Sequence, residues 1–469
     1  MIELWSHQKQ AIDIAKNKDS FGLFFEMGCG KTATAINIIV DKYKKYDSLL
    51  KTIILCPPIV VPNWKAEFLT YSGVNSVNIL LLQGAGTRRL TEFRDKCMFG
   101  SCKIVVTNYE SLLMDKLYDA FMQWGPHILV CDESHKCKQI TAKRTKKAIG
   151  LAKGVKYKLL LTGTPVLNTP MDLFSQFLIM DNGETFGSNF FSFRHTYFYD
   201  ANAAMPKQKH FPNWKVKPGA ERVISSKIES KSMRVTKDQC LDLPPLVKQR
   251  IEVQMTPKQQ TAYTEMKQHF ITYINDQACV AEFAITKALR LQQIVSGFMK
   301  TEDDKVVSLK DTPRMSALRD LLETLTVNNK VIVWAVFKEN YRQIRKVCYE
   351  LKIKYVECHG EVSSVAKEAN IFSFKTDKSV RVFIGHPGSG GIGINLTVSN
   401  YTIFYSRNFS LEADLQAESR NHRGGSEIHN KITRIDLVCP GTIDDEVLKA
   451  LARKEKISEN VLRKMVDNI

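Results

Sequence analysis

One glycine-rich loop, placed between a predicted strand and a predicted helix, constrains the fold of this chain more than any other feature. The loop sequence is Gly28-Cys29-Gly30-Lys31-Thr32. It follows the apolar run 21 to 25 and precedes the run 33 to 40, which we expect to be helical. A strand, a glycine-rich loop and a helix in this order form a phosphate-binding unit, because the loop amides and the helix N-terminus point at the same anion.

In this interpretation each part of the loop has a chemical role. Residues 28 to 30 bring backbone amides to the phosphates, Lys31 neutralises the β and γ phosphates, and the Thr32 hydroxyl holds Mg²⁺. The match to the general pattern G-x-x-x-x-G-K-S/T is incomplete, because its first glycine would fall at Phe25. The predicted strand and helix on either side make the assignment stronger than the pattern alone.

A pair of acids forms the second half of a predicted nucleotide hydrolase. Asp132 and Glu133 follow the apolar run 128 to 131, so a strand end would deliver both side chains beside the phosphate loop. Asp132 would complete the magnesium shell, and Glu133 would orient and deprotonate the attacking water. The alternative, a solvated acidic turn, is less favoured because the phosphate loop is present.

Two arginines near the C-terminus are candidates for contact with the γ phosphate. Arg420 and Arg423 are three residues apart, on one face if the segment is helical, so both can point at one anion. An arginine brought from a second lobe would stabilise transition-state charge and make hydrolysis depend on lobe closure. Considered alone, such arginines are more often surface ion-pair partners.

Short β-rich runs alternate with helical patterns twice along the chain, which predicts an α/β protein with two parallel-sheet lobes and helical insertions. We expect a first lobe over 1–225, with an aromatic and basic insertion near 182–225. A linker and helical insertion follow over 226–300, and a second lobe over 301–469. Paired prolines at 241 to 245 favour an extended connector there.

The composition limits the partners of the chain. Lysines and arginines number 67 against 49 acids, a net charge of +18, which favours nucleic acid or another polyanion. Residues 136 to 158 hold nine basic residues and no acid, a run that is otherwise typical of a solvated helix face.

The absence of an apolar stretch of ~18 residues and of a signal sequence predicts a soluble, cytoplasmic protein without a membrane partner. Eleven cysteines without a CxxC pair predict reduced thiols and no structural metal.

The segment 186 to 217 interleaves aromatic and basic residues. Such a mixture is suited to binding single-stranded nucleic acid, whose unpaired nucleobases stack on aromatic side chains. The alternative, which we favour, is that the aromatic side chains form the core of a small insertion and the lysines its solvated face.

The motifs and their order resemble those of superfamily-two helicases of the switch/sucrose-non-fermenting (Snf-like) branch, and the length resembles that of compact phage or bacterial members. The resemblance covers nearly the whole chain and implies two RecA-like lobes in tandem. The matching stretches are His7-Gln8, EMGCGKT at 26 to 32, ILCPPIVVPNWKAEF at 54 to 68, TNYESL at 107 to 112, DESH at 132 to 135, LTGTP at 161 to 165, MRVTKDQCLDLPPL at 233 to 246, GSGGIGINLT at 388 to 397, QAESRNHRGG at 416 to 425 and GTIDDEVL at 441 to 448.

The resemblance implies ATP and Mg²⁺ as cofactors and gives roles to single residues. Gln8 would contact the adenine, and Arg420 and Arg423 would be the arginine fingers. The residues that would couple hydrolysis to lobe movement are Thr162, Thr164 and Gln416. Two departures are Ser134, where the family has Ala or Gly, and Gly425, where it commonly has Gln.

For DNA, the resemblance implies backbone contacts in several of the same stretches. The residues concerned are Pro58, Asn108, Tyr109, Lys138 and Thr397, with Trp64 and Arg234 in matching stretches. Asn108, Tyr109 and Thr397 have an equal alternative as local structural residues.

The predicted function is an ATP-dependent DNA translocase or helicase that acts, as a monomer, on duplex and branched DNA in recombination, repair or replication. An RNA helicase is a second hypothesis, permitted by the charge. A nucleotide-gated DNA-binding scaffold without turnover is a third, and the intact Lys31, Asp132, Glu133 and Arg420 argue against it.

Overall fold

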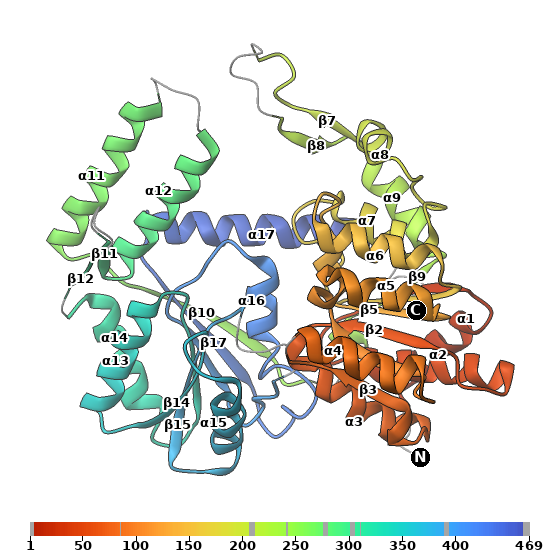
Figure 1. Cartoon of the computed structure of the whole chain (residues 1–469). Coiled ribbons are helices and arrows are strands. Elements are labelled where there is room, and N and C mark those ends of the chain that lie inside the picture. The colour runs from red at the N-terminus through yellow and green to blue at the C-terminus, as the bar shows by residue number, and fades with distance from the viewer. Residues whose placement is uncertain are drawn as a thin grey trace. The chain divides into compact units, whose positions relative to one another are not determined.

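The computed structural model describes residues 4–84, 86–205, 212–240, 243–274, 280–300, 305–309, 311–388 and 394–462 (Figure 1). The chain divides into two compact units, Met1–Leu241 with Lys454–Ile469 and Asp242–Arg453. Of the connector expected at 241 to 245, residues 241 and 242 lie outside the described residues. Within the described ranges, none of the helices has both the length and the apolar character needed to cross a bilayer.

The first unit is built on a seven-stranded sheet in which every neighbouring pair is parallel. In sheet order the strands are β3 (Ile79–Leu82), β4 (Ile104–Asn108), β2 (Thr52–Cys56), β5 (Ile128–Asp132), β6 (Tyr157–Leu161), β1 (Ser20–Phe25) and β9 (Ser232–Val235). The central strands are buried along almost their whole length, which explains their continuous apolar sequences.

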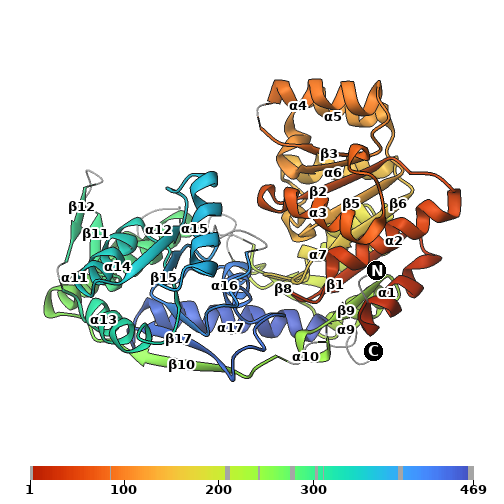
Figure 2. The same cartoon turned by 90° about the horizontal axis from the view of Figure 1, so that it is seen from below.

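The first unit contains ten α-helices among the described residues. They are α1 (Ser6–Lys16), α2 (Lys31–Tyr46), α3 (Val61–Ser72), α4 (Gly86–Phe93), α5 (Asp115–Trp124), α6 (Lys143–Lys153), α7 (Asp172–Asp181), α8 (Phe190–Tyr197), α9 (Ala220–Glu229) and α10 (Lys237–Cys240). Figure 2 shows α4 and α5 near the β3 edge and α1 and α9 near the β9 edge. The carboxyl ends of all strands lie at one edge, where α/β proteins bind ligands.

The second unit contains a six-stranded parallel sheet. In sheet order its strands are β10 (Leu246–Glu252), β17 (Ile432–Val438), β16 (Tyr401–Phe404), β13 (Val331–Trp334), β15 (Val380–Gly385) and β14 (Lys354–Cys358). Its helices are α13 (Pro313–Leu325), α14 (Lys338–Glu350), α15 (Ser364–Thr376), α16 (Leu411–Glu418) and the first part of α17 (Ile443–Leu462). Two parallel α/β sheets confirm the predicted fold class.

The segment 226–300, expected as a linker with a helical insertion, also supplies one edge strand to each sheet. Its strand β9 is the edge strand of the first sheet, and β10 is the edge strand of the second. The predicted long helices are present as α11 (Pro257–Ile274) and α12 (Val280–Val295), which pack as a pair (Figure 1). A two-stranded antiparallel sheet, β11 (Phe298–Lys300) with β12 (Val306–Ser308), follows them.

The aromatic insertion supports the core alternative. Phe186, Phe193 and Tyr197 form a cluster of ring contacts, with centroids 5.0 Å apart for Phe186 and Phe193 and 5.2 Å for Phe193 and Tyr197. Phe193 is 2% exposed, whereas Phe191 is 63% exposed. Residues 206–211, which include two of the lysines, lie outside the described residues. A small antiparallel hairpin, β7 (Phe198–Asp200) with β8 (Trp214–Val216), follows α8.

A buried lysine closes the C-terminal end of α1 and yields a stability prediction. Lys42 Nζ donates to the carbonyl oxygens of Ala15, Lys16 and Lys18 at 3.3, 2.7 and 2.9 Å. We expect Lys42→Met to lower the free energy of unfolding by about 2 to 3 kcal/mol, because buried carbonyls lose a charged donor. Urea unfolding followed by circular dichroism measures this. The exposed Lys44→Met is the control, and equal losses in both variants would contradict the prediction.

Candidate active site

The phosphate loop connects the end of β1 directly to the start of α2. Gly28 and Gly30 have φ of 95° and 75°, in the left-handed region that favours glycine, and Gly30 is the residue before the first turn of α2. A Cβ atom on Gly30 would lie 2.2 Å from Gln8 Nε2. Both the backbone conformation and the neighbouring side chain therefore require glycine here.

Lys31 opens α2 and turns back over the loop. Its Nζ donates to Phe25 O at 2.8 Å and to Glu26 O at 3.3 Å. Thr32, next on the helix, is half-buried. These positions place an ammonium group and a hydroxyl beside the backbone amides of the loop, which is the arrangement that binds the phosphates of a nucleotide.

Asp132 ends β5, two strands from β1 at the same edge of the sheet. Its Oδ2 accepts a hydrogen bond from Trp64 Nε1 at 2.9 Å, and its Oδ1 accepts one from Glu133 N at 3.0 Å. Burial and the Glu133 carboxylate raise the pKa of Asp132 to about 6, against the opposing effects of Trp64 and Lys31. Each carboxylate oxygen keeps a further lone pair, so the group remains able to bind a cation.

Glu133 lies in a left-handed conformation, with φ of 51°, and is 4% exposed. Its Oε2 lies 3.3 Å from His135 Nδ1 and 3.5 Å from Thr162 Oγ1, and these last two atoms are 2.9 Å apart. Thr164 N in turn donates to Thr162 Oγ1 at 3.1 Å. The candidate base and the two predicted coupling threonines therefore form one connected group.

Two members of this region were not predicted as functional residues. His135 is 1% exposed and belongs to the DESH sequence, which is the signal that could have identified it. Ser134, one of the departures from the family pattern, donates through Oγ to Gln176 Oε1 at 2.8 Å. The serine is thus accommodated by a glutamine of α7 and does not disturb the acids beside it.

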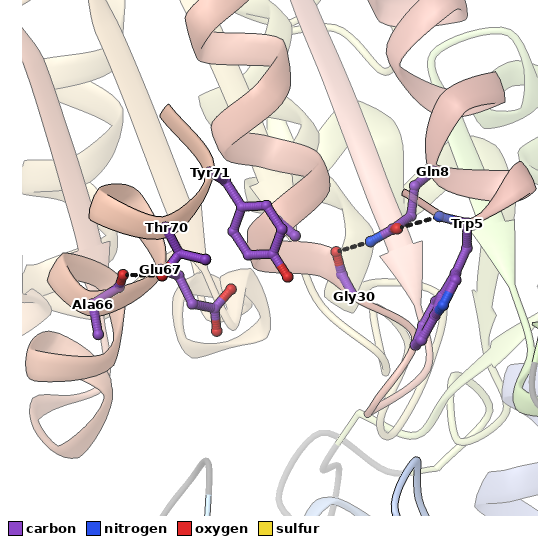
Figure 3. Close-up of a pocket in the computed structure, with 8 residues that line it drawn as sticks. Trp5, Gln8, Gly30, Ala66, Glu67, Thr70 and Tyr71 are labelled. Carbon is purple, nitrogen blue, oxygen red and sulfur yellow. Dashed lines mark hydrogen bonds between the residues drawn. The ribbon is translucent and has the colours of Figure 1, made fainter. Parts of the chain in front are cut away.

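A pocket of about 410 Å³ lies beside the phosphate loop (Figure 3). Its lining residues are Trp5, Gln8, Gly30, Ala33, Ala66, Glu67, Thr70 and Tyr71. Gln8 Oε1 accepts from Trp5 N at 2.8 Å, and Gln8 Nε2 donates to Gly30 O at 3.1 Å. Figure 3 shows Trp5, Gln8 and Gly30 on one side, with the α3 side chains on the other. Gln8, the residue predicted to contact the adenine, is therefore bonded to the phosphate loop and lines the cavity.

The predicted arginine fingers lie in the second unit, in turns and not on a helix. The helix α16 ends at Glu418, where Ser419 has ψ of 0° and Arg420 N bonds to Ala417 O at 3.2 Å, the three-residue spacing of a tightened last turn. The condition for a shared helical face of Arg420 and Arg423 is therefore not met. Arg420 is 3% exposed and Arg423 is half-buried.

A buried charge network, not predicted from the sequence, holds α16 against β17. Arg434 donates to Asp414 at 2.8 Å, to Asp436 at 3.2 Å and also to Glu418. Gln416 is 2% exposed, and its Nε2 donates to Glu412 at 3.2 Å. The helix α16, which leads to Arg420 and Arg423, is therefore anchored to β17 by the ion pairs of Arg434 with Asp414 and Glu418.

The DNA candidates differ in accessibility. Pro58 is exposed at the start of the short helix Pro58–Val60, and Lys138 is half-buried. Thr397 is 8% exposed, and its Oγ1 donates to Asn395 Oδ1 at 2.7 Å. Residues 389–393 of the matching glycine-rich stretch lie outside the described residues.

Asn108 and Tyr109 support the structural alternative that the sequence left open. Asn108 Oδ1 accepts from Ser111 N and from Arg89 Nη1, both at 3.1 Å. Tyr109 is 2% exposed and donates through its hydroxyl to Asp132 O at 2.8 Å. The Tyr109 side chain is therefore inaccessible to a DNA backbone, because it is buried and its hydroxyl is bonded to Asp132 O.

Comparison with known proteins identifies both parts of the chain. Residues 7–305 match the SNF2-related domain, and residues 313–425 match the helicase conserved C-terminal domain. The chain is 26% identical, over 98% of its length, to an uncharacterized ATP-dependent helicase of Mycoplasma genitalium, of which it covers 42%. It is 24% identical, over 93% of its length, to two eukaryotic proteins. These are the human SWI/SNF-related matrix-associated actin-dependent regulator of chromatin subfamily A member 1 and the DNA repair and recombination protein RDH54 of Saccharomyces cerevisiae, of which it covers 41% and 50%.

The chain thus spans half or less of the length of these curated relatives. Among solved structures, the Sulfolobus solfataricus SWI2/SNF2 ATPase core in complex with dsDNA is 22% identical. That alignment covers 99% of this chain and 97% of the other, with a TM-score of 0.44. The SNF2-related match alone extends over more than half of the sequence. With its phosphate loop, its paired acids and its two parallel sheets, this chain belongs to the SNF2-related family of superfamily-two helicases.

Proposed function

We propose that this protein hydrolyses ATP and couples the hydrolysis to movement along DNA. The observation that carries the proposal is the convergence of Lys31, Asp132, Glu133 and Thr162 at the carboxyl edge of one sheet. Each of these groups has a distinct task in phosphoryl transfer, and a scaffold without turnover would not need Glu133 and Thr162 in contact.

The residues present fit a magnesium–nucleotide complex. Thr32 and Asp132 offer a hydroxyl and a carboxylate, the oxygen donors that Mg²⁺ prefers. When bound, Mg²⁺ supplies positive charge to the phosphate oxygens. The loop amides of 28 to 30 and the Lys31 ammonium hold the phosphates, so the chain itself fixes the γ phosphate in place.

Glu133 is proposed to hold the attacking water and to accept its proton. Its carboxylate is held by Thr162 and His135, which restricts its rotation. Thr162 lies in the loop after β6, so movement of this loop would change the position of the base. This link is the proposed path from hydrolysis to conformational change.

The pocket beside Gln8 is proposed to take the adenine. Trp5 and Tyr71 supply aromatic surface, and the Gln8 amide lies at the junction of the pocket and the phosphate loop. Arg420 and Arg423 are proposed to bring positive charge from the second unit to the γ phosphate during hydrolysis. Turnover would then depend on the approach of the two units.

Duplex and branched DNA are the proposed substrates. The net charge of +18 favours a polyanion. Pro58 and Lys138 lie on segments that resemble the DNA contacts of the family, and Lys454 lies near Lys138 and adds to the positive charge there. Relatives include a protein named for DNA repair and recombination and a chromatin regulator, which favours remodelling of DNA structure over long unwinding.

The deciding experiment is phosphate release in the presence of different nucleic acids at matched length. We expect strong stimulation by duplex, forked and four-way DNA, weak stimulation by RNA, and displacement on branched DNA exceeding that on blunt duplex. Branch migration replaces each lost base pair, whereas plain unwinding opposes about 1.4 kcal/mol of stacking per step. Stimulation by RNA alone would favour the RNA helicase, and nucleotide binding without phosphate release would favour the scaffold.

A further inference from the structure

A buried tryptophan contacts the carboxylate that is proposed to bind Mg²⁺. Trp64 is the fourth residue of α3, is 0% exposed, and donates through Nε1 to Asp132 Oδ2 at 2.9 Å. The two residues are 68 positions apart in sequence. A carboxylate that follows a strand end can rotate about its terminal torsion, which has broad minima. The indole N–H on Oδ2, together with Glu133 N on Oδ1, restricts this freedom, while each oxygen keeps a further lone pair.

A second buried aromatic residue holds the backbone at the same position. Tyr109 begins the short helix Tyr109–Leu113 and donates through its hydroxyl to Asp132 O at 2.8 Å. Burial raises the pKa of Tyr109 well above its usual value, so the hydroxyl remains a donor. The end of β5 is therefore held at its side chain by Trp64 and at its carbonyl by Tyr109.

Both aromatic residues belong to segments that also reach the surface. Pro58, Pro62 and Asn63 are exposed in the turn and the first residues of α3, immediately before Trp64. Glu110 is exposed immediately after Tyr109. Each segment thus has an exposed part, in a stretch that resembles a DNA contact, and a buried aromatic side chain on Asp132.

We infer that Trp64 is a positioning residue for the Asp132 carboxylate, and that Trp64 and Tyr109 connect the segments 58–64 and 108–113 to the ATPase centre. This inference rests on the proposed function, in which Asp132 binds Mg²⁺. DNA that displaces either segment would move Asp132, because a buried hydrogen bond transmits the shift directly. The expected consequence is that DNA contact and magnesium binding are coupled within the first unit.

The first test is Trp64→Phe, which keeps an aromatic ring and removes the N–H donor. We expect the Mg²⁺ concentration needed for half-maximal binding of a fluorescent ATP analogue to rise about 10- to 100-fold. DNA affinity without nucleotide should stay at the wild-type value. Trp124→Phe is the matched control, because Trp124 is also buried and donates to a backbone carbonyl, Cys97 O, at 2.9 Å. Equal magnesium dependence in Trp64→Phe and wild type, or an equal rise in both variants, would overturn the inference.

The second test observes the hydrogen bond in the full-length protein. With ¹⁵N-labelled indole groups, the Trp64 resonance is the one lost in Trp64→Phe. We expect it to shift in Asp132→Asn and on addition of Mg²⁺ with the ATP analogue, while the Trp124 resonance stays in place. A Trp64 resonance that does not shift in Asp132→Asn would refute the hydrogen bond between Trp64 and Asp132. Because this measurement needs no hydrolysis, its failure is distinct from a failure of the proposed ATPase activity.

Discussion

Glu133→Gln is expected to lower the rate of ATP turnover by about 10²- to 10⁴-fold while the protein still binds ATP. The amide has the size of the carboxylate but cannot accept the proton of the attacking water. The phosphate cradle is untouched, because Lys31 Nζ is held by the carbonyls of Phe25 and Glu26 and not by Glu133. Phosphate release at saturating duplex DNA gives the turnover, and equilibrium binding of a fluorescent ATP analogue gives the affinity.

Lys31→Ala is the contrasting variant for this prediction. It removes the charge that holds the β and γ phosphates, so both nucleotide affinity and turnover should be lost. The two variants therefore separate binding from proton transfer. Turnover of Glu133→Gln near the wild-type rate would assign the water-activating role to another group.

Arg420→Ala is expected to lower turnover by about 10³-fold or more with little change in DNA affinity. In the proposed mechanism the guanidinium group acts on the γ phosphate and not on the nucleic acid. Arg420→Lys keeps the charge but loses the planar fork, so an intermediate rate is expected. The measurements are DNA-stimulated phosphate release and DNA binding by fluorescence anisotropy.

The control for this prediction is Arg342→Ala, an arginine of the same unit with 68% of its side chain exposed. It should leave turnover unchanged. Thermal unfolding of each variant reports whether loss of the buried Arg420 side chain destabilises the second unit. Parallel loss of DNA binding and turnover at normal stability would instead place Arg420 on the DNA-binding surface.

Local sequence predicted those parts of the protein that depend on near neighbours. The phosphate loop is an example, since its glycines, Lys31 and the apolar runs on either side are contiguous, and the structure places them as strand, loop and helix. Asp132 and Glu133 at a strand end follow from the same reasoning. The alternation of apolar and helical runs was sufficient for two parallel sheets, because the periodicity of each run reflects its own burial.

Predictions that depended on the end of an element were less accurate. The sequence left open whether the arginine segment is helical, and the structure ends α16 at Glu418, with Arg420 N bonded to Ala417 O in a turn. The segment 226–300 was expected as a linker with a helical insertion; the helices are present, and β9 and β10 in addition form an edge of each sheet. An edge strand is decided by the neighbour that it pairs with, and a single segment does not contain that information.

The amino-acid sequence was enough to predict the reactive groups: a phosphate loop, a pair of acids, two arginines and an excess of positive charge. How these groups are held depends on the tertiary structure. Trp64 and Tyr109, in stretches that resemble DNA contacts, face inward onto Asp132. Arg434 of β17 pairs with Asp414 and Glu418 of α16. The physical reason is that side-chain hydrogen bonds between distant segments depend on strand order and helix packing, which no local pattern specifies.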